Sequence, residues 1–191
     1  MGFLQTYNHF LSTRPLLTKM VTSGTIGALG DLLCQTMEIY NSKKGEKEYN
    51  FNRTRTFFIM GTFYVAPILH VMYSRILPAL VPEVTAVGAI KKLLVDQLCA
   101  APLIMLGFFP AINFVEGRSF SQSVQDLKEK YVATMIANYK IWPPANLINF
   151  MFVPIQYQVL WANFISLFFN AVLSYMHNTY KGEHEEVKKE Q

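Results

Sequence analysis

The chain has 191 residues, of which 51% are hydrophobic and 14% aromatic, while only 16% are charged. A soluble domain usually carries about 25% charged residues, so this composition favours a single-domain integral membrane protein. The formal charge of +4 is dispersed, which argues against a nucleic-acid interface, and two cysteines (Cys34 and Cys99) are too few for a disulfide framework.

The first 30 residues contain no acidic side chain, and they lack the charged start, apolar core and cleavage site of a secretory signal. Five of their apolar residues could form one amphipathic face: Phe3, Leu4, Tyr7, Phe10 and Leu11. This segment weakly resembles an organelle-targeting sequence.

Four apolar stretches follow, each close to the roughly 20 residues that cross a bilayer as a helix. We predict membrane spans at about residues 20–40, 56–74, 93–115 and 155–176. Ionisable groups interrupt the first three: Asp31 and Glu38 in the first, His70 in the second and Asp96 in the third. The first span is the least hydrophobic and needs neighbouring helices to cover its polar side. An even number of spans places both termini on one side, and the nearly equal distribution of basic residues does not decide which.

Residues 116–140, between the third and fourth spans, show apolar side chains at helical spacing. The apolar positions are Val124, Leu127, Tyr131 and Met135, opposite the polar positions Gln125, Lys128 and Glu129. This pattern predicts an amphipathic helix lying at the membrane interface.

Residues 141–180 contain no Asp, Glu, Lys or Arg, and three prolines divide them. Because proline lacks a backbone donor and obstructs the preceding turn, we expect breaks at Pro143, Pro144 and Pro154. Residues 145–153 are then a short lead-in to the last span. Polar residues recur every seventh position through this region: Asn149, Gln156, Asn163, Asn170 and His177. In an unbroken helix they would form one polar column.

Together these elements predict an all-α membrane protein with a single domain over residues 1–191. The fold is a bundle of four transmembrane helices, with an amphipathic interfacial helix between spans three and four and a charged tail at residues 181–191.

Polar side chains in the spans should face the bundle interior, because an ionisable group at membrane depth costs at least about 3 kcal/mol. The candidate interior or pore-lining residues are Asp31, Gln35, His70, Asp96, Gln97, Gln156, Asn163 and Asn170. They could line a water-filled path, or they could hold helices together through hydrogen bonds of about 0.6 kcal/mol or more each. Both interpretations remain open.

Three glycines indicate close helix packing, since Gly24, Gly27 and Gly107 each stand four residues from another small side chain. No HExxH, CxxC, phosphate-binding loop or dinucleotide motif occurs, and the four histidines are scattered. We therefore expect neither an enzyme nor a metal site, and no cofactor.

A set of short motifs occurs in a fixed order along nearly the whole chain. The set comprises Arg14-Pro15-Leu16, Gly30-Asp31 with Gln35, Asp96-Gln97 with Pro102, Asn138-Tyr139-Lys140-Ile141-Trp142-Pro143, Asn149-Phe150, Val153-Pro154 and Leu173-Ser174. In this order the motifs resemble the Mpv-seventeen and 22-kilodalton peroxisomal membrane protein family, which also includes Sym-one-like proteins.

This resemblance implies four spans in the mitochondrial inner membrane, or alternatively in the peroxisomal membrane. It also implies passage of small solutes and, for mitochondrial members, upkeep of metabolite pools and mitochondrial DNA. The sequence departs from the family at Ala66, Met72, Gln158 and Phe169. Gln158 replaces a common arginine, so the last span has no formal charge, and any anion selection by that arginine is in doubt here.

Two functions follow as hypotheses. The chain is either a weakly selective channel for small metabolites or a non-conducting subunit that binds lipid or a larger inner-membrane assembly, such as a respiratory complex. Expected partners are membrane lipids and further copies of the chain or other membrane proteins, with no direct contact to nucleic acid.

Overall fold

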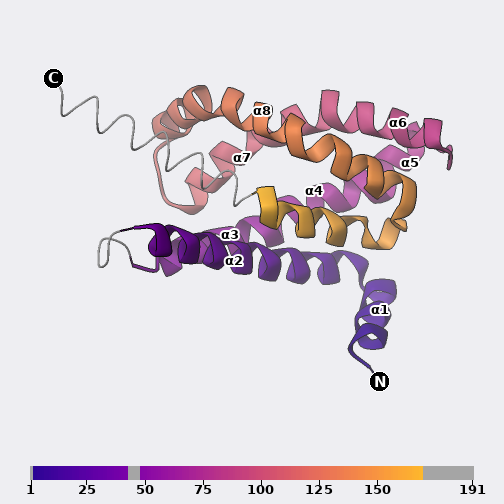
Figure 1. Cartoon of the computed structure of the whole chain (residues 1–191), viewed down its shortest axis with the longest axis horizontal. Coiled ribbons are helices and arrows are strands. Elements are labelled where there is room, and N and C mark those ends of the chain that lie inside the picture. Colours follow the sequence, from indigo (N-terminus) through magenta and orange to yellow (C-terminus); the bar gives the residue numbers. More distant parts are fainter. Residues whose placement is uncertain (1, 43–47, 170–191) are drawn as a thin grey trace.

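The computed structural model describes residues 2–42 and 48–169, and every element within those ranges is helical (Figure 1). The helices are α1 (Phe3–Thr13), α2 (Pro15–Asn41), α3 (Phe51–Met60), α4 (Ala66–Val71), α5 (Leu77–Leu80), α6 (Ala86–Val95), α7 (Ala101–Val115) and α8 (Phe120–Phe152). A 3₁₀ turn (Ile155–Tyr157) follows, and residues 158–169 continue as helix. The all-α prediction is confirmed for these residues.

Two of the predicted spans lie inside long continuous helices. Elements α3 to α5 form one helix, Phe51–Leu80, and α6 and α7 form another, Ala86–Val115; both are long and apolar enough to cross a membrane. They contain the predicted spans at 56–74 and 93–115. The predicted span at 20–40 lies within α2, and the one at 155–176 extends beyond the described residues, so these two stay predictions.

A proline follows each π-helical turn in these two helices. The turns Gly61–Val65, Met72–Ile76 and Asp96–Ala100 are each succeeded, two residues later, by Pro67, Pro78 and Pro102 respectively. In a regular α-helix the proline ring would collide with the carbonyl four residues earlier. The wider π turn gives that carbonyl room, so the helix continues past the proline.

The bundle consists of two helical layers with a fifth helical segment between them. Helix α2 packs against α3 and α4, while α8 packs against α6 and α7. Residues 158–169 run between α2 and α8 (Figure 1). At the centre of this arrangement Tyr73, Leu77, Val159 and Ala162 form a buried apolar cluster.

Helix α8 corrects one expectation, because Pro143 and Pro144 lie inside it and do not end it. The carbonyls that lose their donors belong to Tyr139 and Lys140, which are both exposed and can find other partners. The predicted break at Pro154 is confirmed, since α8 ends at Phe152 and Val153 is extended, as residues before proline prefer. Residues 145–152, which were expected to form a separate lead-in, are therefore the last part of α8. The interfacial position of residues 116–140 stays a prediction.

The turn between α7 and α8 is held by one acidic side chain. Gly117 supplies the turn with a positive φ of 70°. Asp126 accepts hydrogen bonds from Lys130 Nζ at 2.8 Å and Asn113 Nδ2 at 3.0 Å, and it forms an ion pair with Arg118 at 3.4 Å. Burial alone would raise the pKa of Asp126, but these hydrogen bonds and the two cationic neighbours together lower it.

Large apolar side chains cover the outside of the two long helices. Phe63, Leu98 and Leu103 are each about two-thirds exposed, and many other apolar side chains of these helices are open as well. An apolar surface of this extent is rare on a soluble monomer. It fits helices that face lipid, with their polar groups turned inward.

Candidate functional site

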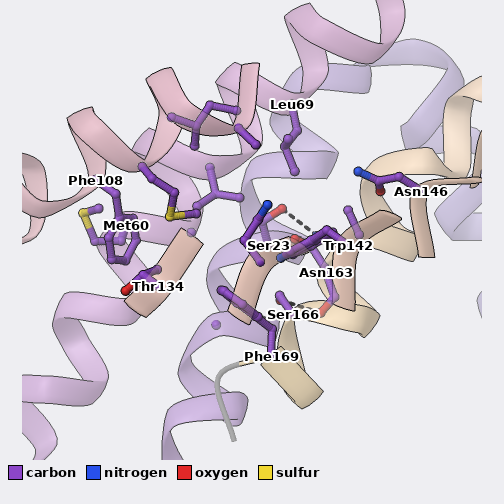
Figure 2. Close-up of a pocket in the computed structure, with 18 of the residues that line it drawn as sticks. Ser23, Met60, Leu69, Phe108, Thr134, Trp142, Asn146, Asn163, Ser166 and Phe169 are labelled. Atoms are coloured by element: carbon purple, nitrogen blue, oxygen red, sulfur yellow. Dashed lines mark hydrogen bonds between the residues drawn. The ribbon is translucent and has the colours of Figure 1, made fainter. Parts of the chain in front are cut away.

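A cavity of about 200 Å³ lies in the interior of the bundle. Its wall is formed by residues of α2, of the two long helices, of α8 and of the segment 158–169. Its polar lining residues are Ser23, Asp96, Gln97, Thr134, Asn138, Asn146, Asn163 and Ser166. Figure 2 shows Ser23, Asn163 and Trp142 close together, with Phe108 and Met60 on the opposite side from Asn146.

One wall of the cavity carries a chain of amide and carboxylate groups. Asn138 Nδ2 donates to Gln97 Oε1 at 3.1 Å, and Gln97 Nε2 donates to Asp96 Oδ2 at 2.7 Å. Asn146 Nδ2 donates to the same Asp96 oxygen, also at 2.7 Å. Asp96 is only 5% exposed, so these two amides satisfy a carboxyl group that is shielded from solvent.

The local backbone explains why these groups meet. Asp96 and Gln97 open the π turn before Pro102. Because Pro102 has no N–H, the carbonyl five residues earlier, that of Gln97, lacks a backbone donor; it accepts instead from Tyr139 Oη at 3.2 Å. On α8, Asn138 and Asn146 stand eight residues apart, about two turns, so both point toward this turn.

Two buried polar atoms on the cavity wall have no hydrogen-bond partner within the described residues. They are Trp142 Nε1, a donor, and Asn146 Oδ1, an acceptor, four residues apart on α8. Buried polar groups are nearly always hydrogen-bonded to protein or to water. The cavity wall therefore offers one donor and one acceptor to which a small polar molecule could bind.

Another part of the cavity wall joins α2 to residues 158–169. Asn163 Nδ2 donates to Ser23 Oγ at 2.7 Å, and Ser166 Oγ donates to the Asn163 carbonyl at 2.6 Å. The Trp142 and Phe169 rings meet edge to face with centroids 5.8 Å apart. The predicted interior residues Asp96, Gln97 and Asn163 are therefore brought together around one cavity.

Asp31 and Gln35 are buried, but they are not among the residues that line the cavity. They belong to a separate network between α2 and α3. Asp31 Oδ2 accepts from Gln35 Nε2 at 2.6 Å and from Thr54 Oγ1 at 2.8 Å, while Arg53 Nε lies 2.6 Å from Asp31 Oδ1. Arg53 also bridges to both oxygens of Glu38 at 3.1 Å. The positions of Asp31 and Gln35 therefore do not support the expectation that they line a water-filled path.

His70 also lies outside the cavity lining. Its Nδ1 atom is 3.2 Å from Lys19 Nζ and 3.4 Å from Ser74 Oγ, at the opposite end of α2 from Asp31. His70 therefore belongs to a basic cluster near the junction of α1 and α2.

Gln156 corrects the expectation of one continuous polar column, because it is exposed. The break at Pro154 and the 3₁₀ turn change the helical register, so Asn149 and Gln156 do not share a face. Gln158 is buried instead, and its Nε2 donates to the Val153 carbonyl at 3.2 Å and the Asn149 carbonyl at 3.5 Å. Asn170 lies outside the described residues.

The glycines named from the sequence mark close approaches of helices. An added Cβ at Gly24 would collide with Thr62 Oγ1, at Gly27 it would lie 2.9 Å from the Phe57 carbonyl oxygen, and at Gly107 2.5 Å from Tyr64 Oη. The first two positions let α2 approach the helix Phe51–Leu80, and the third lets the two long helices approach each other.

Comparison with known proteins finds relatives along nearly the whole chain. Residues 113–174 match the Mpv17 / PMP22 family. Peroxisomal membrane protein 2 of Bos taurus is 31% identical over 172 residues, covering 90% of this chain and 87% of that protein. PXMP2/4 family protein 2 of Dictyostelium discoideum is 32% identical, with 89% and 88% covered. Mitochondrial inner membrane protein Mpv17 of Rattus norvegicus is 30% identical, with 92% and 97% covered. No solved structure matches the chain.

Proposed function

The chain belongs to the Mpv17 / PMP22 family, as its motifs indicated, and from this premise we propose that it lets small metabolites cross an organelle membrane through its interior cavity. The names of its relatives support the mitochondrial inner membrane, with the peroxisomal membrane as the alternative. In the mitochondrion such passage would support metabolite pools and mitochondrial DNA upkeep. The proposal assigns transport and no catalytic step to the chain.

The free donor and acceptor on the cavity wall carry this proposal. Trp142 Nε1 and Asn146 Oδ1 lack hydrogen-bond partners, although the amide side chains of Gln97, Asn138 and Asn146 each make at least one hydrogen bond. Buried polar groups without a protein partner are usually hydrogen-bonded to water. Their position on the cavity wall supports occupation by water and small polar solutes.

The lining chemistry supports weak selectivity. Amides offer donors and acceptors in equal measure, so they can replace part of the hydration shell of many solutes. Asp96 is the one Asp, Glu, Lys, Arg or His residue among the described lining residues. We propose that its carboxylate favours cations over anions. A cavity of about 200 Å³ admits water and small ions, and larger metabolites need the helices to move apart.

We also propose that four helices of the chain cross the membrane. The two long helices of 30 residues would each extend about 45 Å and can cross the hydrocarbon core of about 30 Å with tilt. Helix α2 and the helix that begins at residue 158 supply the other two spans, because both contribute residues to the wall of the interior cavity.

Solute release from liposomes tests the proposal. The purified chain is reconstituted with trapped small solutes, and release is compared with that of Ala101→Leu, which fills the cavity from a buried lining position. Ala86→Leu is the matched control, because Ala86 is exposed and does not line the cavity. We expect Ala101→Leu to reduce release and Ala86→Leu to leave it unchanged.

Ion selectivity in planar bilayers supplies the second test. Asp96→Asn keeps the shape of the side chain and an acceptor for Gln97 and Asn146, but it removes the negative charge. We expect conductance to persist and the preference for cations to fall. Equal release by the two leucine variants, Ala101→Leu and Ala86→Leu, together with unchanged selectivity in Asp96→Asn, would contradict passage through this cavity. Absence of any conductance, with stoichiometric co-purification of other membrane chains in mild detergent, would support the accessory-subunit function instead.

A further inference from the structure

A basic groove of about 520 Å³ lies where α1 meets α2, near the C-terminal end of the long helix Phe51–Leu80. It is lined by Arg14, Pro15, Leu16, Leu17, His70, Val71 and Arg75. Arg14 joins α1 to α2, and Arg75 lies in the π turn that precedes α5. The groove is separate from the interior cavity, since the two share no lining residue.

A buried cation lies directly behind this groove. Lys19 is only 3% exposed, and its Nζ contacts His70 Nδ1 at 3.2 Å and Ser74 Oγ at 3.4 Å. Neither contact is with an acid, although a buried ammonium group is normally paired with one. An anion in the groove would supply the missing negative charge.

The two arginines of the groove are also without acidic partners. Neither Arg14 nor Arg75 forms an ion pair with any residue that the structure describes. The chain contains no Asp or Glu in residues 2–30 or 49–82, which include every segment that lines the groove. Three cationic side chains therefore converge at one place with no acidic partner among the residues that the structure describes.

The surroundings of the groove are those of a membrane surface. Helix α1 runs across the end of α2 (Figure 1), and its Leu4 and Phe10 are exposed, as expected for a helix that rests on a bilayer. Leu17 and Val71, which line the same groove, are exposed apolar side chains. The groove thus offers cations beside an apolar wall.

We propose that this groove binds the headgroup phosphate of an anionic phospholipid. Arg14 and Arg75 contact the phosphate oxygens, Lys19 contributes positive potential from behind His70, and an acyl chain lies along Leu17 and Val71. Basic pockets at the ends of membrane helices bind such headgroups, and the arginine fork matches phosphate oxygens. This site does not depend on conduction through the interior cavity.

Lipid binding to the full chain tests the site. The protein is purified in mild detergent, and its affinity for phosphatidylglycerol and for phosphatidylcholine is measured by native mass spectrometry. The variants are Arg14→Gln, Arg75→Gln and the pair; both side chains are exposed, so folding should persist. Arg55→Gln is the matched control, because Arg55 is equally exposed, has no ion pair within the described residues and lies away from the groove.

We expect the preference for phosphatidylglycerol to fall about five-fold for each arginine and about 25-fold for the pair. Arg55→Gln should leave the preference unchanged. An unchanged preference in the double variant, or an equal loss in Arg55→Gln, would overturn the proposal. Competition by inorganic phosphate at matched ionic strength separates the sources of the anion. Displacement of the lipid only at high phosphate concentration supports a lipid site, whereas strong phosphate binding without lipid, lost in the double variant, would identify a soluble anion and overturn it.

Discussion

The ion pair between Asp31 and Arg53 gives the sharpest prediction about stability, because its two partners differ in burial. The Asp31 side chain is fully buried, whereas the Arg53 side chain is 31% exposed and has Glu38 as a second partner. Removing Arg53 leaves a buried carboxylate without its counter-ion. Removing the charge of Asp31 leaves an arginine that can still bind Glu38 and reach solvent.

The magnitudes follow from this asymmetry. Loss of one partner from a buried ion pair costs about 3 to 5 kcal/mol, and the exposure of Arg53 places Arg53→Gln at the lower end, about 3 kcal/mol. Asp31→Asn keeps an acceptor for Gln35 and Thr54 and should cost about 1 kcal/mol. The double variant lacks the buried charge altogether and should be more stable than Arg53→Gln alone.

The free energy of unfolding is measured by titrating the folded protein in mild detergent with sodium dodecyl sulfate. A double-mutant cycle of the two substitutions should give a coupling free energy of about 2 kcal/mol in favour of the pair. If Asp31→Asn proves more destabilising than Arg53→Gln, or if the double variant is the least stable of the three, the reasoning from burial is wrong.

Three further predictions concern packing, the Pro154 break and pH. Gly61→Ala should destabilise the fold by about 1 to 3 kcal/mol, because its Cβ would lie 2.5 Å from the Ser23 carbonyl oxygen; thermal unfolding in detergent measures this. Gln158→Leu should cost about 1 to 3 kcal/mol in the same assay, since the Val153 carbonyl loses its donor. The lowered pKa of Asp126 contributes stability above its unfolded pKa of about 3.9, and this contribution is lost as pH falls through the lower folded pKa. The stability difference between the wild-type chain and Asp126→Asn should therefore be full near neutral pH and vanish in acid.

A specific result would contradict each of these three predictions. Tolerance of alanine at position 61 would mean that α2 does not approach the helix Phe51–Leu80 so closely. An unchanged unfolding temperature in Gln158→Leu would mean that this side chain does not bridge the Pro154 break. A stability difference that persists unchanged into acid would show that the ion pairs of Asp126 do not lower its pKa.

The sequence predicts helices best where contact with lipid requires apolar side chains around the whole helix. Hydropathy located the spans at 56–74 and 93–115 for that reason, and both lie within continuous helices. Their π turns could not be read from hydropathy, although the prolines at 67, 78 and 102 are the signal that accompanies them. The breaks expected at Pro143 and Pro144 failed because tertiary contacts hold both flanks of α8, including Trp161 Nε1 to the Ala145 carbonyl at 2.9 Å.

The candidate site was only partly visible in the sequence. Asp96, Gln97 and Asn163 were found because polar groups inside an apolar span must turn inward. Asn146 was missed because it fell in a segment interpreted as a lead-in, yet its spacing of eight residues from Asn138 was a usable signal. Gln156 was misplaced because the seven-residue column assumed an unbroken helix through Pro154.

The contacts of charged residues near the ends of the spans were harder still to predict from the sequence. Arg53 lies outside the predicted spans, and its pairing with Asp31 depends on how α2 and α3 meet in space. The basic groove likewise joins Arg14 and Arg75, which are distant in sequence and share no motif. Spacing along one helix cannot reveal contacts between helices, so these features required the three-dimensional arrangement.

The conductance of single reconstituted molecules tests the central claim most directly. Purified wild-type chain in a planar bilayer of defined lipid should give discrete openings, with cations preferred over anions, and Ala101→Leu should reduce the current while Ala86→Leu does not. A silent bilayer containing correctly folded protein, or openings indifferent to Ala101→Leu, would contradict the assignment of a solute path to the cavity beside Asp96, Trp142 and Asn146.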